Sequence, residues 1–147
     1  GNVLVNTGGS NTLSFGVDGK QSTLEGDIRS TGGKNEITIN HGAIKGGILA
    51  TGNETDNLKS SNMIYLNTAK LEDSYLFAKT EGEAGKFEAR NRVDLKGDSS
   101  VIFRDYEGNA ILASGKNSGN LVNDLTMGAN TSIISSNILA ENEGTNT

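Results

Sequence analysis

The chain has 147 residues and a net charge of −5, with no cysteine, proline or tryptophan but with 20 glycines and 18 asparagines. This length fits one domain, and because only 33% of the residues are hydrophobic, a compact two-layer core would be thin. The absence of cysteine excludes disulfides, thiol catalysis and cysteine-bound metals, and the 13 scattered basic residues argue against binding to nucleic acid or to an anionic membrane.

A five-residue pattern, Asn-x-apolar-x-apolar, recurs five times along the chain. Its apolar residues alternate with a period of two, which is typical of a short strand with one buried face. The copies occupy residues 11–15, 35–39, 62–66, 91–95 and 123–127, so that successive asparagines are 24, 27, 29 and 32 residues apart. We therefore predict one such strand in each of five repeats.

A second apolar pattern follows each copy of the first. Its three-residue copies begin at Ile28, Ile48, Tyr75, Ile111 and Ile138. Residues 35–50 and 62–77 align without a gap, which matches Ile44 with Leu71 and Ile48 with Tyr75. Glycine and asparagine in the intervening segments permit the positive φ that tight turns need. Each repeat is therefore predicted to be strand, turn, strand, turn.

A repeat of about 27 residues cannot bury its apolar face alone, so the repeats must stack, as in solenoids. We predict an all-β fold, a parallel β-helix of about five rungs, at residues 1–30, 31–57, 58–86, 87–118 and 119–147. Every internal strand would then be central, which explains the absence of proline, because proline donates no hydrogen bond to a ladder. An antiparallel sandwich, or a chance recurrence of the short pattern, is the alternative.

Each rung would place equivalent residues at equivalent positions. The asparagines of the first pattern can form a ladder of side-chain amides, and its two apolar positions can form two inward columns. The predicted ladder comprises Asn11, Asn35, Asn62, Asn91 and Asn123. The predicted core columns are Leu13, Ile37, Ile64, Val93 and Leu125, and Phe15, Ile39, Leu66, Leu95 and Met127.

These repeats resemble a known family. The run from Asn35 to Gly52, with a weaker relative at residues 23–33, is similar to the passenger repeats of autotransporters, the type V secreted surface proteins of Gram-negative bacteria, in particular adhesin-like and vacuolating-cytotoxin-like passengers. The resemblance covers most of the chain and is strongest over residues 11–78. It implies that the β-helix is right-handed, that the chain is a segment of a longer rod, and that it lies on the bacterial outer membrane or is secreted.

Candidate catalytic and metal-binding residues are few. The only histidine, His41, is expected in a solvated turn, because a second histidine for a metal site is missing, and the Gly-Lys pairs lack the other residues of a phosphate-binding loop. Acidic residues do not recur at the spacing of calcium-binding β-helices. We therefore expect no cofactor, no metal and no nucleotide.

Carboxylates could serve a β-helical polysaccharide lyase or hydrolase. Asp94, Asp98 and Asp105 fall in one irregular repeat, and an inverting hydrolase needs two carboxyl groups about 6.5–9.5 Å apart. However, outward positions and turns carry charges for solubility in any case, and sugar sites normally offer aromatic platforms. We expect Phe15 and Phe77 inside the stack, and we predict that the protein is not an enzyme.

The resemblance implies a structural and adhesive role. Loops between strands would attach to a host-cell receptor or glycan or to neighbouring bacterial cells, and the rods could also associate with one another. Residues 52–60, 79–92 and 104–109 depart most from the repeat, and irregular loops often carry function. The alternatives are a plain spacer and a toxin-like passenger that associates with itself and acts on host cells.

Overall fold

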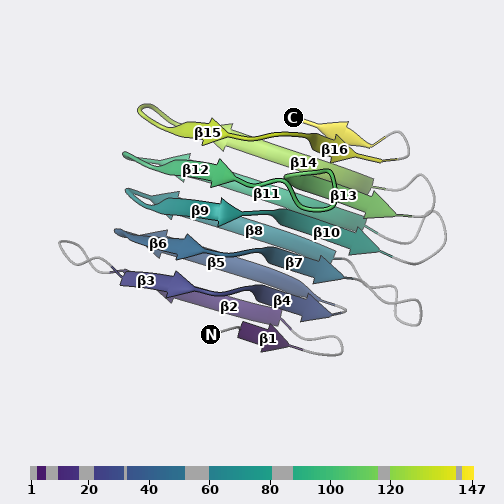
Figure 1. Cartoon of the computed structure of the whole chain (residues 1–147), viewed down its shortest axis with the longest axis horizontal. Helices are drawn as coiled ribbons and strands as arrows, with labels where there is room; N and C mark the ends of the chain where they lie inside the picture. The colour runs from purple at the N-terminus through teal and green to yellow at the C-terminus, as the bar shows by residue number, and fades with distance from the viewer. Residues whose placement is uncertain are drawn as a thin grey trace.

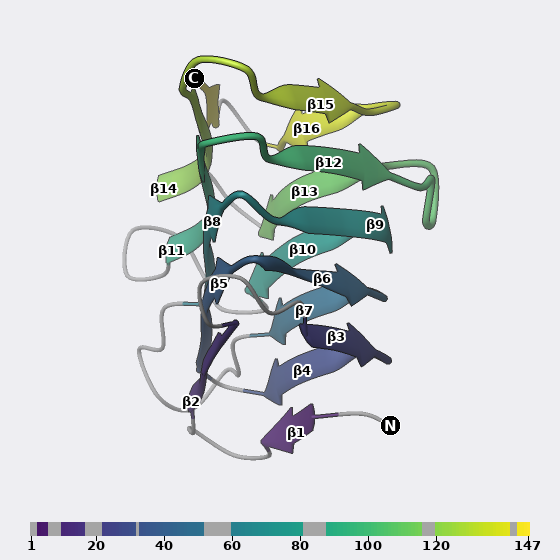
Figure 2. The ribbon, with the colours of Figure 1, turned by 90° about the vertical axis from the view of Figure 1, so that its left-hand side faces the viewer.

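The chain winds as a parallel β-helix. The structure, a computed structural model, describes residues 3–5, 10–16, 22–31, 33–51, 60–80, 88–115, 120–141 and 144–147. In this part of the chain, seventeen strands form three parallel sheets, and there is no helix. Figure 1 shows the strands stacked in layers from the N-terminus at the bottom to the C-terminus at the top, and Figure 2 shows the faces that they form.

Each sheet takes one strand from every coil. Sheet A consists of β1 (Val3–Val5), β4 (Ile28–Thr31), β7 (Ile48–Thr51), β10 (Leu76–Thr80), β13 (Ile111–Gly115) and β16 (Ile138–Ala140). Sheet B consists of β2 (Ser10–Phe15), β5 (Lys34–Asn40), β8 (Ser60–Asn67), β11 (Glu88–Lys96), β14 (Asn120–Met127) and β17 (Thr145–Asn146). Sheet C consists of β3 (Ser22–Glu25), β6 (Gly42–Lys45), β9 (Lys70–Ser74), β12 (Ser100–Phe103) and β15 (Ser132–Ile134).

One coil runs through sheets B, C and A in turn. The five coils that contain all three strands are β2–β4, β5–β7, β8–β10, β11–β13 and β14–β16. All the pairings between these strands are parallel and join equivalent strands of neighbouring coils. The prediction of an all-β parallel β-helix of about five rungs is thus confirmed, and an antiparallel sandwich is excluded.

The interior is filled by alternate residues of sheet B together with inward residues of the other two sheets. Ile37, Ile64 and Val93 are aligned in successive strands and have no exposed surface. The neighbouring column of Ile39, Leu66 and Leu95 is also buried. Burial of one such side chain contributes about 1.5–3 kcal/mol. Leu13 and Leu125, at the two ends of the first column, are partly buried against this core.

Two predicted core placements are wrong. Met127 is 49% exposed, because β17 pairs only with Val122 and Asn123 of β14, and no described strand covers the end where Met127 lies. Phe77 is buried but lies on the outer face of sheet A, since it alternates with the inward residues Leu76 and Ala78 and belongs to a separate cluster. The side chain of Phe15 lies outside the described part of the chain.

The predicted gap-free alignment of residues 35–50 with residues 62–77 is wrong by one residue after Leu71. Ile44 pairs with Leu71 as predicted, but Ile48 pairs with Leu76 and not with Tyr75. The extra residue is accommodated in β9, whose pairing with β12 is irregular and whose Asp73 has a φ of 48°. This bulge places Tyr75 between two strands and leaves its ring outside the interior core.

Candidate functional site

The asparagines of sheet B form a continuous hydrogen-bonded row through the protein. The side-chain Nδ2 of each donates to Oδ1 of the next, with donor–acceptor distances of 2.8–2.9 Å. The members are the five predicted residues, Asn11, Asn35, Asn62, Asn91 and Asn123, followed by Asn146, which accepts from Asn123 at 2.8 Å. Asn35, Asn62, Asn91 and Asn123 have no exposed surface.

The second hydrogen of each of the five predicted asparagine amides ties sheet B to sheet A within the same coil. It donates to the backbone oxygen of the second residue of the sheet A strand, for example from Asn62 to Phe77 at 2.7 Å and from Asn91 to Leu112 at 2.8 Å. Both hydrogens and the oxygen of these buried amides are therefore used. A fully satisfied buried polar network fixes the geometry around it, so the row holds successive coils in one register.

Asn146 is a member of the row that the repeat pattern did not indicate. It lies 23 residues after Asn123, close to the spacing of the first two asparagines. The pattern places its first apolar residue two positions after the asparagine, and for Asn146 that position lies beyond the printed sequence. The only signal in the sequence for Asn146 was therefore its spacing from Asn123.

Between β12 and β13, the chain folds back over the outer face of sheet A. Tyr106 and Asn109 exchange two backbone hydrogen bonds of 2.8 and 3.0 Å, so residues 104–109 form a small hairpin, called here the strap. The Tyr106 ring stacks on Tyr75 with centroids 4.0 Å apart and lies 5.5 Å from Phe77. The strap thus covers outward-facing apolar side chains that would otherwise meet solvent. The other two candidate contact segments fall largely on residues 52–59 and 81–87, which lie outside the described residues.

Charged side chains border this aromatic cluster. The Arg104 guanidinium lies 5.2 and 5.9 Å from the centroids of the two tyrosine rings, and the Lys79 ammonium lies 5.0 Å from the centroid of Phe77. Lys79 also pairs with Glu107 of the strap at 3.0 Å. Cation–π contacts at exposed sites contribute about 0.5–1 kcal/mol each, so these cations help to hold the strap against the sheet.

An ion pair lies at one end of the cluster. Asp27 accepts hydrogen bonds from Arg29 at 2.8 Å and from the Gly47 amide at 2.9 Å. Burial raises the pKa of Asp27, but the Gly47 amide and the Arg29 guanidinium outweigh it, so the pKa lies below its ordinary value of 3.8. The pKa of Tyr75 is raised, chiefly by burial and also by the nearby Asp27 carboxylate. This cluster is therefore a structural junction between coils.

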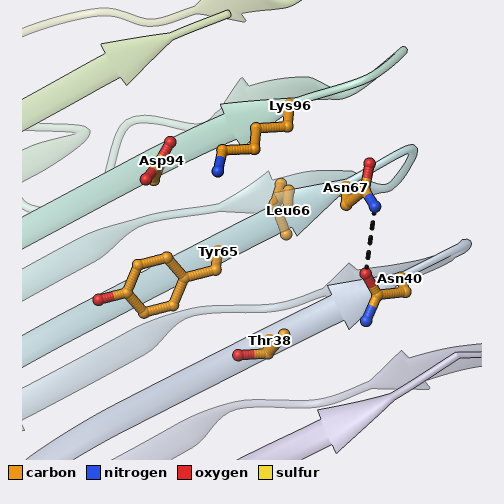
Figure 3. A pocket seen from close by; sticks show the side chains of 7 residues that line it. All are labelled: Thr38, Asn40, Tyr65, Leu66, Asn67, Asp94 and Lys96. Carbon is orange, nitrogen blue, oxygen red and sulfur yellow. Dashed lines mark hydrogen bonds between the residues drawn. The ribbon is translucent and has the colours of Figure 1, made fainter.

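A hollow of about 240 Å³ lies on the outer face of sheet B. It crosses β5, β8 and β11, and Figure 3 shows the side chains around it. The lining residues are Thr38, Asn40, Tyr65, Leu66, Asn67, Asp94 and Lys96. Asn67 donates a long hydrogen bond of 3.4 Å to Asn40, which links two adjacent coils at one side of the hollow.

The repeat pattern contained a signal for this hollow. The fourth position of each Asn-x-apolar-x-apolar copy lies between two inward residues and therefore points outward. Strand pairing aligns these positions in one column, in which Thr38, Tyr65 and Asp94 are direct neighbours. The inward columns alone do not reveal the hollow, whereas this outward column combines an aromatic ring with polar neighbours.

The candidate catalytic residues do not come together in one site. Asp94 lies on β11, Asp98 in the following turn, and Asp105 on the strap. His41 is a corner residue between sheets B and C, with a φ of 55°. Its backbone amide donates to the backbone oxygen of Asn67 at 3.1 Å. Thr68 and Gly97 occupy the equivalent corner in the next two coils, with φ of 52° and 62°.

Two further features are absent from the described ranges, a metal-binding cluster and a membrane-spanning helix. There, no group of three or more histidine, cysteine, aspartate or glutamate residues is placed to hold a metal ion. The same residues include no helix that could span a lipid bilayer.

Comparison with other proteins adds no family. No protein-family model matches the sequence, and no curated protein or solved structure matches it either. The resemblance to autotransporter passengers therefore depends on the repeat pattern alone.

Proposed function

We propose that this chain is a structural segment of an attachment protein, displayed on a bacterial surface or secreted, whose stacked coils hold an outward binding surface for a cell-surface receptor, a glycan or a neighbouring cell. The observation that carries the proposal is the uninterrupted asparagine row from Asn11 to Asn146. It joins every complete coil to the next and so makes a stiff support on which lateral surfaces keep their relative positions.

Two further observations support this function. The repeats resemble autotransporter passengers, and the chain contains no cysteine that could form a disulfide during secretion. Among the described residues, the candidate catalytic carboxylates are distributed over separate elements. The outer faces of the described strands carry the hollow and the strap.

An attachment assay with coated beads tests the proposal. Fluorescent beads that carry the folded protein are added to cultured epithelial cells and, separately, to Gram-negative bacteria, and bound beads are counted as bead concentration rises. We expect saturable attachment to at least one of these surfaces that soluble protein competes away. Attachment no greater than that of albumin-coated beads, by protein shown to be folded, would overturn the proposal.

A size measurement distinguishes the toxin-like alternative. Light scattering before and after addition of lipid vesicles reports the oligomeric state. An attachment segment should not release dye from the vesicles, whereas a membrane-acting toxin should do so as it assembles.

A further inference from the structure

The hollow around Tyr65 spans three consecutive coils. Thr38 precedes Tyr65 in the outward column and Asp94 follows it, each as a direct partner in the ladder. Adjacent strands lie about 4.8 Å apart, so the three side chains extend over about 10 Å along the helix axis. The backbone beneath them belongs to β8 and its two neighbours, and β8 is hydrogen-bonded on both sides. The backbone positions that carry these side chains are therefore fixed before any ligand arrives.

The chemical groups of the hollow suit a small polyhydroxylated ligand. The Tyr65 ring offers an apolar plane, as Figure 3 shows, and its hydroxyl can donate or accept a hydrogen bond. The Thr38 hydroxyl and the amides of Asn40 and Asn67 also provide both donors and acceptors. A saccharide ring presents an apolar face of C–H groups and a rim of hydroxyl groups, and these two features match the ring and the polar groups around it.

The charges of the hollow favour a neutral ligand. One carboxylate, on Asp94, and one ammonium group, on Lys96, line it, so their formal charges offset each other. No described side chain pairs with either group or with the Tyr65 hydroxyl. All three are therefore available to hydroxyl groups of a ligand, which can donate to the carboxylate and accept from the ammonium group.

We propose that this hollow binds a neutral saccharide unit, with the Tyr65 ring against its apolar face and with Asp94 and Lys96 hydrogen-bonded to its hydroxyl groups. The volume of about 240 Å³ is smaller than the roughly 300–1,000 Å³ of sites for drug-sized ligands, so it suits a single sugar ring. The inference rests on the proposed attachment function, for which it names a ligand class and a site.

Titration of the whole chain by nuclear magnetic resonance tests the inference. The probes are the methyl glycosides of galactose, glucose and N-acetylglucosamine, with N-acetylneuraminic acid and inorganic phosphate as anionic comparisons. We expect saturable shifts of the backbone amides at Thr38, Tyr65 and Asp94 with at least one neutral glycoside, with a Kd of about 1 mM. We expect no saturation with the anions.

Variants on the same face identify the groups responsible. Tyr65→Ala removes the apolar plane and should weaken binding at least about tenfold, equivalent to 1.4 kcal/mol, whereas Tyr65→Phe keeps the plane and should bind within about threefold of the native protein. Thr126→Ala, two coils further along the same column, is the matched control and should bind as the native protein does.

Three results would overturn the saccharide site: no saturable shift with any neutral glycoside, a preference for the anions, or equal affinity for the native protein and Tyr65→Ala. The bead assay separates this failure from failure of the attachment function. Native beads that attach, with a native protein that shows no saturable shift with any neutral glycoside, would leave attachment intact and remove the subsite. Native beads that fail to attach, with protein that still binds a glycoside, would overturn the attachment function and leave the saccharide site intact.

Discussion

The ring of Tyr75 lies against the backbone of Gly47, so close that a β-carbon at Gly47 would stand 2.1 Å from Cζ of the ring. Gly47 is buried, and its amide donates to Asp27. The Tyr75 ring also stacks on Tyr106 of the strap. The ring therefore fills a slot between one coil and the strap, and the missing side chain of Gly47 provides the room.

Gly47→Ala should destabilise the fold by about 1–3 kcal/mol, because the methyl group overpacks this slot. The cost should fall when Tyr75 is replaced by alanine as well, since the obstructing ring is then absent. Urea unfolding of the native protein, both single variants and the double variant gives the coupling energy. Strict additivity of the two substitutions would show that the ring does not limit space at Gly47.

Asn62→Ala should cost about 1–3 kcal/mol in the free energy of unfolding, because it leaves the Phe77 carbonyl and the amides of Asn35 and Asn91 without their partner. Asn67→Ala is the matched control, since the Asn67 side chain is exposed and makes only the 3.4 Å bond; it should change stability by less than about 0.5 kcal/mol. Chemical denaturation measures both. Similar losses for the two variants would contradict a special role of the row.

Tyr106→Ala should open the strap and expose Phe77 and Tyr75. We expect a loss of about 1–2 kcal/mol, from the aromatic contacts and their buried area, together with increased fluorescence of an apolar dye that binds exposed hydrophobic surface. Tyr106→Phe retains the stacked ring and should behave as the native protein does. If Tyr106→Ala binds no additional dye, the strap does not shield the cluster.

The pH dependence of the free energy of unfolding should report the ionisation of Asp27 beside Arg29 and Gly47. Because the pKa of Asp27 is lower in the folded protein than its ordinary value of 3.8, its ionised form adds stability above that value, and the contribution disappears as the pH falls through the lower, folded-state pKa. Asp27→Asn should therefore lose less stability than the native protein between about pH 5 and pH 2.

Arg29→Gln gives an intermediate test of the same junction. It removes the ion pair but keeps the hydrogen bond from Gly47, so its stability should fall with acid less steeply than that of the native protein and more steeply than that of Asp27→Asn. Urea midpoints at a series of pH values measure the three slopes. Identical slopes for the native protein and Asp27→Asn would exclude the junction as an acid-sensitive contact.

The sheet B strands could be predicted from sequence because two constraints act on the same residues. The period of two marks which side chains face inward, and the asparagine before each apolar pair marks the starting position. A shift by one residue would have turned Ile37 and Ile64 outward, so the pattern allowed only one register. The structure accordingly aligns Asn35 with Asn62 and Ile37 with Ile64.

The register of sheet A could not be read in the same way. Tyr75, Leu76 and Phe77 are all apolar, so the pattern fits equally well when moved by one residue. The bulge at Asp73 decides between the two fits, and a conformation with positive φ at an aspartate leaves no clear mark in the sequence. The hollow shows a similar limit: its outward column was predictable from the repeat, but its concave shape depends on how side chains of three coils lie together.

Every link in the asparagine row runs in one sense: the coil nearer the N-terminus supplies the N–H group, and the following coil supplies the oxygen. The amide dipoles therefore add along the axis, and each bond polarises the next. A coil stacked upside down would set oxygen against oxygen or N–H against N–H. The apolar columns make no such distinction, whereas the asparagine row has a donor end and an acceptor end, and it therefore disfavours a reversed neighbour alongside the parallel backbone ladders.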